Sequence, residues 1–199
     1  MPATRTTLRD DILAVALSLL TSEGPTAVSI RRIARELGVS PGAAYHHFDG
    51  KGALYRALIA DGLAAVEQAI LDATDAGAPP LDRLVATARA YAAFGIDRPD
   101  HYYVMMMLRA DGIPELSDAD KAPGMRVLAL TAEAIEAGMA DGSIRPLDNP
   151  FGAALLLWTT LHGVVALAAS HRLAMTVPGL DAQVLIEAAI DRSLGLLRA

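Results

Sequence analysis

The segment Ser29–Lys51, SIRRIARELGVSPGAAYHHFDGK, constrains the fold more than any other part of this 199-residue chain. Its first half has apolar residues at i, i+3, i+4 and i+7, which predicts a short helix with one apolar face. These residues are Ile30, Ile33, Ala34 and Leu37. Gly38 ends the helix, because glycine readily adopts the left-handed backbone that a tight turn requires. The pattern therefore predicts a helix-turn-helix arrangement.

The second helix of this pair begins with clear start signals and carries a polar face. Ser40 is a favoured N-cap, and Pro41 suits the first helical position because its missing N–H has no partner there. Tyr45, His46 and His47 follow. A tyrosine beside two histidines is unusual for a core, so we expect this helix to point outwards, as a recognition helix in a DNA groove does.

Residues 33–58, IARELGVSPGAAYHHFDGKGALYRAL, resemble the DNA-binding signature of the TetR family of bacterial transcriptional regulators. The signature has IA, GVS, small residues, Tyr, an aromatic residue or His, Phe, and then Lys before an apolar helix. The resemblance spans residues 8–58 and implies an all-α fold. It implies a three-helix, helix-turn-helix DNA-binding domain at residues 1–50 and a helical ligand-binding and dimerisation domain at residues 51–199.

The resemblance also implies which side chains contact DNA. The first helix of the pair offers its capped N-terminus to a phosphate, and small residues at the start of the second let its backbone approach base edges. Arg5 and Arg9 are further candidates from the N-terminal arm. The expected DNA-binding residues are Ser29, Arg31, Ser40, Pro41, Gly42, Ala43, Tyr45, His46, His47 and Lys51.

The charge distribution fits this division. The net charge is −6, but residues 1–56 hold seven Lys/Arg and five Asp/Glu, whereas residues 57–199 hold ten and eighteen. The positive excess lies with the recognition helix, and the acidic remainder is repelled by phosphates. The chain has no cysteine, which is compatible with a reducing compartment. The apolar run at residues 12–20 follows two aspartates instead of a basic segment, so we expect no signal peptide and a cytoplasmic protein.

Helical patterns cover nearly the whole chain, and no strand-like alternation interrupts them. About nine helices are expected. The first begins after Thr7, and the helix-turn-helix pair follows. The others are expected at about 51–75, 81–96, 99–107, 124–140, 151–173 and 180–197, with a loop at 112–123. The helix that starts at Lys51 joins the two domains, so the boundary is a hinge and not a free linker.

Residues 151–170, FGAALLLWTTLHGVVALAAS, are the one segment long enough to cross a bilayer. A helix that is apolar on all sides is equally typical of a buried core or interface helix. The DNA-binding head favours the second interpretation, and we expect no membrane contact. The alternative is a helical membrane-associated or interaction module that uses residues 151–170.

The resemblance implies a homodimer on a palindromic double-stranded DNA operator. The helices at 151–173 and 180–197 are the candidates for the dimer contact. The first has small residues that permit close packing, and the second has an apolar side suited to a four-helix seam. The residues on that side are Leu185, Ile186, Ala189, Ile190, Leu194 and Leu197.

A small-molecule effector is expected in the C-terminal domain. Trp158, His162 and Gly163 form W-x-x-x-HG, which resembles the C-terminal domain of one TetR subgroup. Aromatic and methionine side chains suit an adaptable pocket for an apolar or aromatic effector, although ordinary core packing is the alternative for each. The expected ligand-binding residues are Tyr91, Phe94, Tyr102, Tyr103, Met106, Met107, Met125, Trp158 and His162.

The expected function is a ligand-responsive transcriptional regulator, and repression is the family's common case. Enzymatic chemistry is not expected, because the chain has no cysteine, no glycine-rich phosphate loop and no H-E-x-x-H. For the same reason no catalytic residue, metal site or cofactor is assigned.

Overall fold

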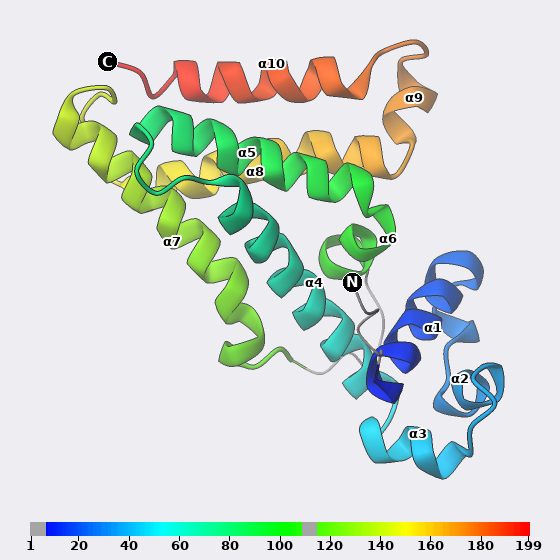
Figure 1. Ribbon diagram of the computed structural model, residues 1–199. Coiled ribbons are helices and arrows are strands. Elements are labelled where there is room, and N and C mark those ends of the chain that lie inside the picture. Colours follow the sequence, from blue (N-terminus) through cyan, green and yellow to red (C-terminus); the bar gives the residue numbers. More distant parts are fainter. Residues whose placement is uncertain (1–6, 109–114) are drawn as a thin grey trace, which may run out of the picture.

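The computed structural model describes residues 7–108 and 115–199, and within these ranges every regular element is a helix (Figure 1). The one strand-like feature there is an isolated antiparallel bridge between Ile144 and Arg198. The all-α prediction is confirmed, with ten α-helices in the described ranges where about nine were expected.

The N-terminal part, which we call the head, contains four elements. They are α1 (Leu8–Glu23), the 3₁₀ turn η1 (Pro25–Ala27), α2 (Ile30–Glu36) and α3 (Pro41–His47). The rest, which we call the body, begins with α4 (Lys51–Ala73), α5 (Pro80–Asp97), α6 (Pro99–Tyr102) and the π-helical segment η2 (Tyr103–Met107). It continues with α7 (Asp118–Asp141), α8 (Pro150–Ala169), α9 (Arg172–Thr176) and α10 (Ala182–Gly195).

The head helices begin and end where local chemistry predicts. Thr7 caps α1 in a capping box with Asp10, and Ser29 and Ser40 accept hydrogen bonds from backbone N–H groups at the starts of α2 and α3. Gly38, between α2 and α3, has a φ of +67°, a left-handed conformation that glycine adopts without strain. The helix-turn-helix geometry thus follows from the sequence of the turn itself.

Helix α4 belongs to two hydrophobic cores. Its first half contributes Leu54 and Leu58 to the head core, and its second half contributes Val66 and Ile70 to the body core. Leu63, between them, packs against both cores. Figure 1 shows α4 running diagonally from the head towards α5, α8 and α10 at the other end of the molecule, with α7 beside it. The head is therefore attached to the body through a continuous helix.

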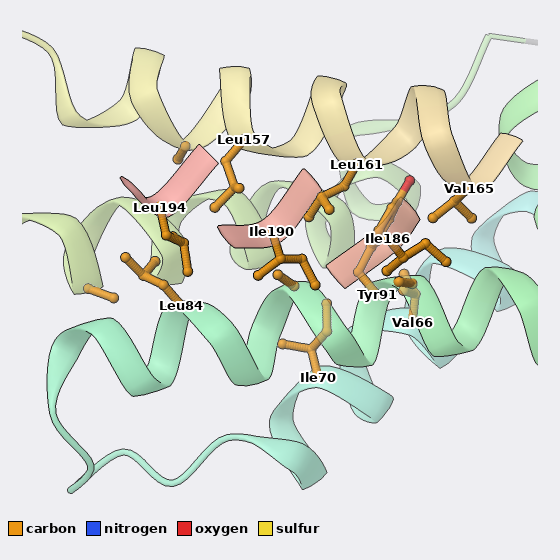
Figure 2. Packing of buried hydrophobic residues seen from close by; sticks show 14 of the residues in the cluster. Val66, Ile70, Leu84, Tyr91, Leu157, Leu161, Val165, Ile186, Ile190 and Leu194 are labelled. Carbon is orange, nitrogen blue, oxygen red and sulfur yellow. The ribbon is translucent and has the colours of Figure 1, made fainter. Parts of the chain in front are cut away.

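The body core differs from the sequence prediction for the last helix. Ile186, Ile190 and Leu194 of α10 are buried against α5 and α8 of the same chain (Figure 2). Leu197, just beyond α10, lies in the same core. The sequence pattern had assigned this side to a seam between two subunits. Because these side chains are already covered within one chain, a partner would have to meet the opposite face of α10.

Three element boundaries also differ from expectation. Helix α7 starts at Asp118 and includes Pro123, because Ser117 and Asp120 form a capping box whose two hydrogen bonds favour an earlier start. The expected long helix at 151–173 ends at Ala169, and the short α9 follows a left-handed His171. The segment after α6 is π-helical, with the Leu108 N–H donating to the Tyr103 carbonyl over 2.9 Å.

Candidate nucleic-acid interface and internal cavity

The two faces of α3 differ sharply in burial. Ala44 is fully buried and Phe48, directly after the helix, is 5% exposed, so one face is held in the head core. Pro41, Gly42, His46 and His47 are exposed, as is Tyr45, while Ala43 is half-buried. The predicted recognition helix therefore presents its small N-terminal residues and its polar side chains to solvent together. A helix held in this way suits a DNA major groove.

Helix α2 packs against α3 and offers further groups at its start. The Ser29 hydroxyl accepts a hydrogen bond from the Arg32 N–H over 3.2 Å, and Arg31 is exposed. Arg32 instead forms a two-pronged ion pair with Glu23 of α1, with N–O distances of 2.9 and 2.6 Å. This pair fixes α2 against the end of α1.

Lys51 has an intramolecular contact that the sequence did not predict. Its ammonium donates to the carbonyl oxygen of Pro25, to which the Tyr55 hydroxyl also donates over 3.3 Å. Two of its three N–H groups are left for other partners, a phosphate included. The contact ties the turn between α1 and α2 to the start of α4. Of the arm residues, Arg9 lies 3.5 Å from Asp61 on α4, and Arg5 is outside the described residues.

The body contains an apolar cavity of about 200 Å³ between α4, α5, α7 and α8. Its lining residues are Leu63, Val66, Ile70, Tyr91, Met106, Gly124, Val127, Leu128 and Trp158. A smaller space of about 30 Å³ adjoins it and shares five of these residues. No lining residue of either space carries a charge. Such a cavity favours an uncharged apolar ligand, because an unpaired charge is strongly disfavoured there.

Three polar side chains meet in the core beside this cavity. The Tyr102 Oη lies 2.6 Å from Nδ1 of His162, and the Tyr91 Oη lies 3.2 Å from both the Tyr102 Oη and the same nitrogen. The indole of Trp158 stacks on the His162 ring at a centroid distance of 5.5 Å. We call Tyr91, Tyr102 and His162 the polar triad. It links α5, α6 and α8.

Burial controls the protonation of the polar triad. It lowers the pKa of His162, which favours the neutral imidazole. Burial also raises the pKa of Tyr102 far above its ordinary value, and the neighbouring Tyr91 adds to this effect. For Tyr91, burial raises the pKa, and hydrogen bonding with Tyr102 and Trp158 partly opposes the rise. All three groups are therefore uncharged near neutral pH.

The structure brings together only some of the predicted ligand-binding residues. Tyr91, Met106 and Trp158 line the cavity, and Tyr102 and His162 join it through the polar triad. Phe94 and Met107 pack in the body core. Tyr103 and Met125 are 39% and 52% exposed and line neither space.

Sequence reasoning missed the aliphatic walls that α4 and α7 contribute, because a valine or leucine beside a cavity has the same pattern as one in a filled core. Sequence reasoning also missed an ion pair between α4 and α7. Arg126 of α7 donates two hydrogen bonds, of 2.5 and 2.7 Å, to the carboxylate of Glu67 on α4. Glu67 is 8% exposed, so this pair holds α4 against α7 next to the cavity.

Helices α8 and α10 leave a large apolar surface uncovered, which we call the outer face. Its exposed members include Leu155, Leu156 and Leu167 of α8 and Val184 of α10, and Leu196 follows α10. Within the described ranges α8 is also the one helix long and apolar enough to cross a membrane, with 22% of that stretch buried. Exposed apolar side chains gathered on neighbouring helices are typical of an interaction surface.

Comparison with known proteins gives two family matches. Residues 12–58 match the bacterial regulatory proteins of the tetR family, and residues 84–193 match the tetracyclin repressor-like C-terminal domain. The HTH-type transcriptional repressor KstR2 of Mycolicibacterium smegmatis is 27% identical over 150 residues, which cover 73% of this chain and 70% of that protein.

Two further comparisons extend over more of the chain. An uncharacterised HTH-type transcriptional regulator of Mycobacterium tuberculosis, Rv0681, is 29% identical over 164 residues, 80% of this chain and 69% of that protein. A solved structure of a protein of unknown function from Rhodococcus sp. RHA1 is 28% identical and superposes over the full length of both chains with a TM-score of 0.80.

Proposed function

Because the chain belongs to the TetR family of bacterial transcriptional regulators and is a DNA-binding regulator, we propose that it is a repressor released from its operator by a small apolar effector. The observation that carries this proposal is the position of α4. One half of this helix completes the core under the recognition helix, and the other half forms a wall of the cavity.

On the DNA side, the proposed contacts are exposed and half-buried groups around α3 and at the starts of α2 and α4. These residues are Ser29, Arg31, Ser40, Pro41, Gly42, Ala43, Tyr45, His46, His47 and Lys51. Pro41, Gly42 and Ala43 let the backbone approach the bases, and Tyr45 and His46 project into the groove. Ser29, Arg31, Ser40, His47 and Lys51 hold the phosphates. The division at residue 50 is part of the same proposal, with α4 as the joint between a DNA-binding and an effector-binding part.

Two copies of the chain would be needed to span a palindromic site, because half-sites lie about 34–36 Å apart. We propose that the outer face of α8 and α10 meets the same face of a second copy. Leu156 and Val184 are 65% and 61% exposed there, which is unfavourable in a monomer. Gly163, in the W-x-x-x-HG sequence, has open space at its Cβ position, which permits close approach of a partner helix.

The effector would act by favouring one position of α4 over another. A ligand between α4 and α7 that fits best when these helices are further apart would tilt α4 and move the two recognition helices out of register. Glu67 and Arg126 would resist that separation in the DNA-bound state. The coupling required is about 1–3 kcal/mol, which is typical of allosteric regulators.

The test uses fluorescence anisotropy with the DNA that flanks the protein's own gene. We expect wild type to bind and Tyr45→Ala to lose at least about tenfold in affinity, because one good contact to a base contributes about 1–3 kcal/mol. Tyr103→Ala, which removes a tyrosine of similar exposure from the body, is the control and should bind normally. Normal binding by a folded Tyr45→Ala protein would contradict the proposed interface. Tight effector binding that leaves operator affinity unchanged would contradict the proposed release.

A further inference from the structure

We propose that one copy of the chain places its α9 segment, residues 171–180, in a groove of a second copy, between the start of α8 and the end of α10. The inference rests on the proposed function, since it assigns the partner of a site on the outer face. Three observations support it: an exposed apolar segment at one end of that face, a groove at the other end, and their equal spacing from Gly163 of α8.

The α9 segment presents apolar side chains to solvent. Met175 is 80% exposed, more than any other large apolar side chain in the described ranges. Val177 and Leu180 follow it and are also exposed. Leu173 is buried, so the segment is anchored on its own chain while Met175 is open to solvent. Apolar side chains exposed together in so short a segment favour a partner that covers them.

A groove of about 570 Å³ lies at the opposite end of the outer face, and Leu156 and Leu196 of that face line it. An apolar cavity of about 150 Å³ holds benzene, so several side chains fit in this groove. The one ionised lining residue, Arg145, already donates from Nε to the Leu196 carbonyl over 2.8 Å. The apolar lining residues are Leu147, Ala153, Leu156, Leu157, Leu196 and Leu197.

A two-fold axis brings these two ends together. Figure 1 shows the head at one end of the molecule, with α8 and α10 lying across the other. An axis parallel to α8 would turn the partner's head away from the DNA, so the axis must cross α8. The two copies of α8 are then antiparallel, and the end of each lies beside the start of the other. Such a contact closes after two copies, whereas a head-to-tail contact would continue into a filament.

The spacing along α8 fits an axis at Gly163. This glycine is exposed and has open space at its Cβ position, so two helices can approach closely there. The α8 residues of the groove run from Gly152 to Thr160, and Leu156 is their middle. Leu156 lies seven residues before Gly163, and Ser170, where α8 ends, lies seven residues after it. Both intervals are about 10 Å along the helix, so the partner's α9 segment meets the groove.

The experiment uses pairs of introduced cysteines, because the chain has no cysteine of its own. The double variant Ala153→Cys, Met175→Cys is treated with a short bismaleimide and run on a denaturing gel. We expect a covalent dimer from the double variant and none from either single variant. A link within one chain is excluded, because the part of α8 after Ala153 separates the two sites by about 24 Å. The control pair Leu71→Cys, Met175→Cys should form no dimer.

A second variant measures the contribution of the contact without a crosslink. Met175→Ser should raise the dissociation constant of the dimer at least about tenfold, because each dimer loses two buried methionine side chains. Light scattering over a dilution series measures the constant, and circular dichroism checks folding. Met125→Ser, which removes a methionine of α7 that is 52% exposed, is the matched control and should dimerise as wild type does.

The results separate this proposal from the proposed function. A covalent dimer from Met175→Cys alone would contradict the α9 contact, because the two α9 segments would then lie side by side. A double variant that is dimeric by light scattering but forms no crosslink would also overturn it, as would an unchanged dissociation constant for Met175→Ser. Both results would leave the outer-face dimer standing. A monomeric wild-type protein would overturn the α9 contact and the dimer together. Operator release is measured by anisotropy of labelled DNA, and its failure would contradict only the repressor mechanism.

Discussion

His162 is the residue whose chemistry depends most on its surroundings. It lies beside a cavity without charged walls, stacks on Trp158 and shares a hydrogen bond with the Tyr102 hydroxyl through Nδ1. Because burial lowers its pKa, the folded protein holds the neutral form at a pH where the unfolded chain takes up a proton. The sequence identified this histidine, but only the structure shows that its partners are two tyrosine hydroxyls.

This difference predicts how stability depends on pH. Above the ordinary histidine pKa of about 6.5 both states are neutral and the contribution is complete. As the pH falls from there towards the lowered folded pKa, the unfolded state gains protons and stability is lost. His162→Gln should therefore show a smaller drop in urea midpoint between about pH 7.5 and about pH 5.5 than wild type.

His101 has a pKa that is also lowered, chiefly by burial, and it contributes a similar loss in both proteins. The comparison between wild type and His162→Gln removes this shared part. An equal drop in the two proteins would show that His162 takes up its proton as easily when folded as when unfolded.

Ser40 has two proposed roles that substitution can separate. Its hydroxyl accepts a hydrogen bond from the Ala43 N–H and caps the seven-residue α3, and it is also a proposed DNA contact. Ser40→Ala should destabilise the protein by about 1 kcal/mol, whereas Ser40→Gly should cost only a few tenths, because glycine is tolerated at an N-cap. If the hydroxyl also binds phosphate, both variants should lose operator affinity, including the stable one. Normal operator affinity of the Ser40→Gly protein would show that the Ser40 hydroxyl only caps α3.

At the scale of elements, α4 and α7 are joined by an ion pair that differs from the others in burial. The carboxylate side chain of Glu67 is 11% exposed, whereas Glu187, which pairs with Arg89 of α5 in the same two-pronged way, is 33% exposed. Leaving a carboxylate buried without its cation is more unfavourable than leaving one in water.

Arg126→Met should therefore lower the midpoint of urea unfolding clearly more than Arg89→Met, although both remove one arginine from one glutamate. Unfolding followed by circular dichroism at equal ionic strength makes the comparison. Equal losses in the two variants would mean that Glu67 reaches water as readily as Glu187 does. If Arg126 also holds α4 in the DNA-bound position, Arg126→Met should in addition weaken operator binding.

The sequence predicted the helices and their ends better than it predicted which elements pack against each helix face. The caps at Ser29 and Ser40 and the turn at Gly38 are local, and the structure has each of them. The apolar side of α10 was recognised, but its assignment to a second subunit did not hold for Ile186 and Ile190. Periodicity shows that a face is covered without showing what covers it. The residues that line the cavity could not be predicted for the same reason, because an apolar residue beside an empty space has the same periodicity as one in a filled core.

At the scale of the whole molecule, the outer face decides the oligomeric state. Leu156→Glu places a charge on a side chain that is 65% exposed in one chain, so folding should survive. In the proposed dimer the same charge would be buried without a partner, and the variant should be a monomer by light scattering. Its operator affinity should fall at least about a hundredfold, because one head must then bind alone.

Leu71→Glu, a leucine of α4 that is 46% exposed, is the matched control and should remain dimeric. A dimeric Leu156→Glu protein would place the contact elsewhere on the surface. Full solubility of the wild-type protein without detergent would also argue against the membrane alternative for α8, whose inner side packs against α7 and α10.

Val104 of η2 is 1% exposed and lies in the head core, although some fifty residues separate it from the start of α4. The head core therefore includes a side chain from the body. For this reason recombination could not transfer the head alone as a self-contained domain. A chimaera that joined residues 1–60 to a foreign effector domain would carry a hole where Val104 belongs. It would fold well only if the recipient supplied an aliphatic residue at the same place.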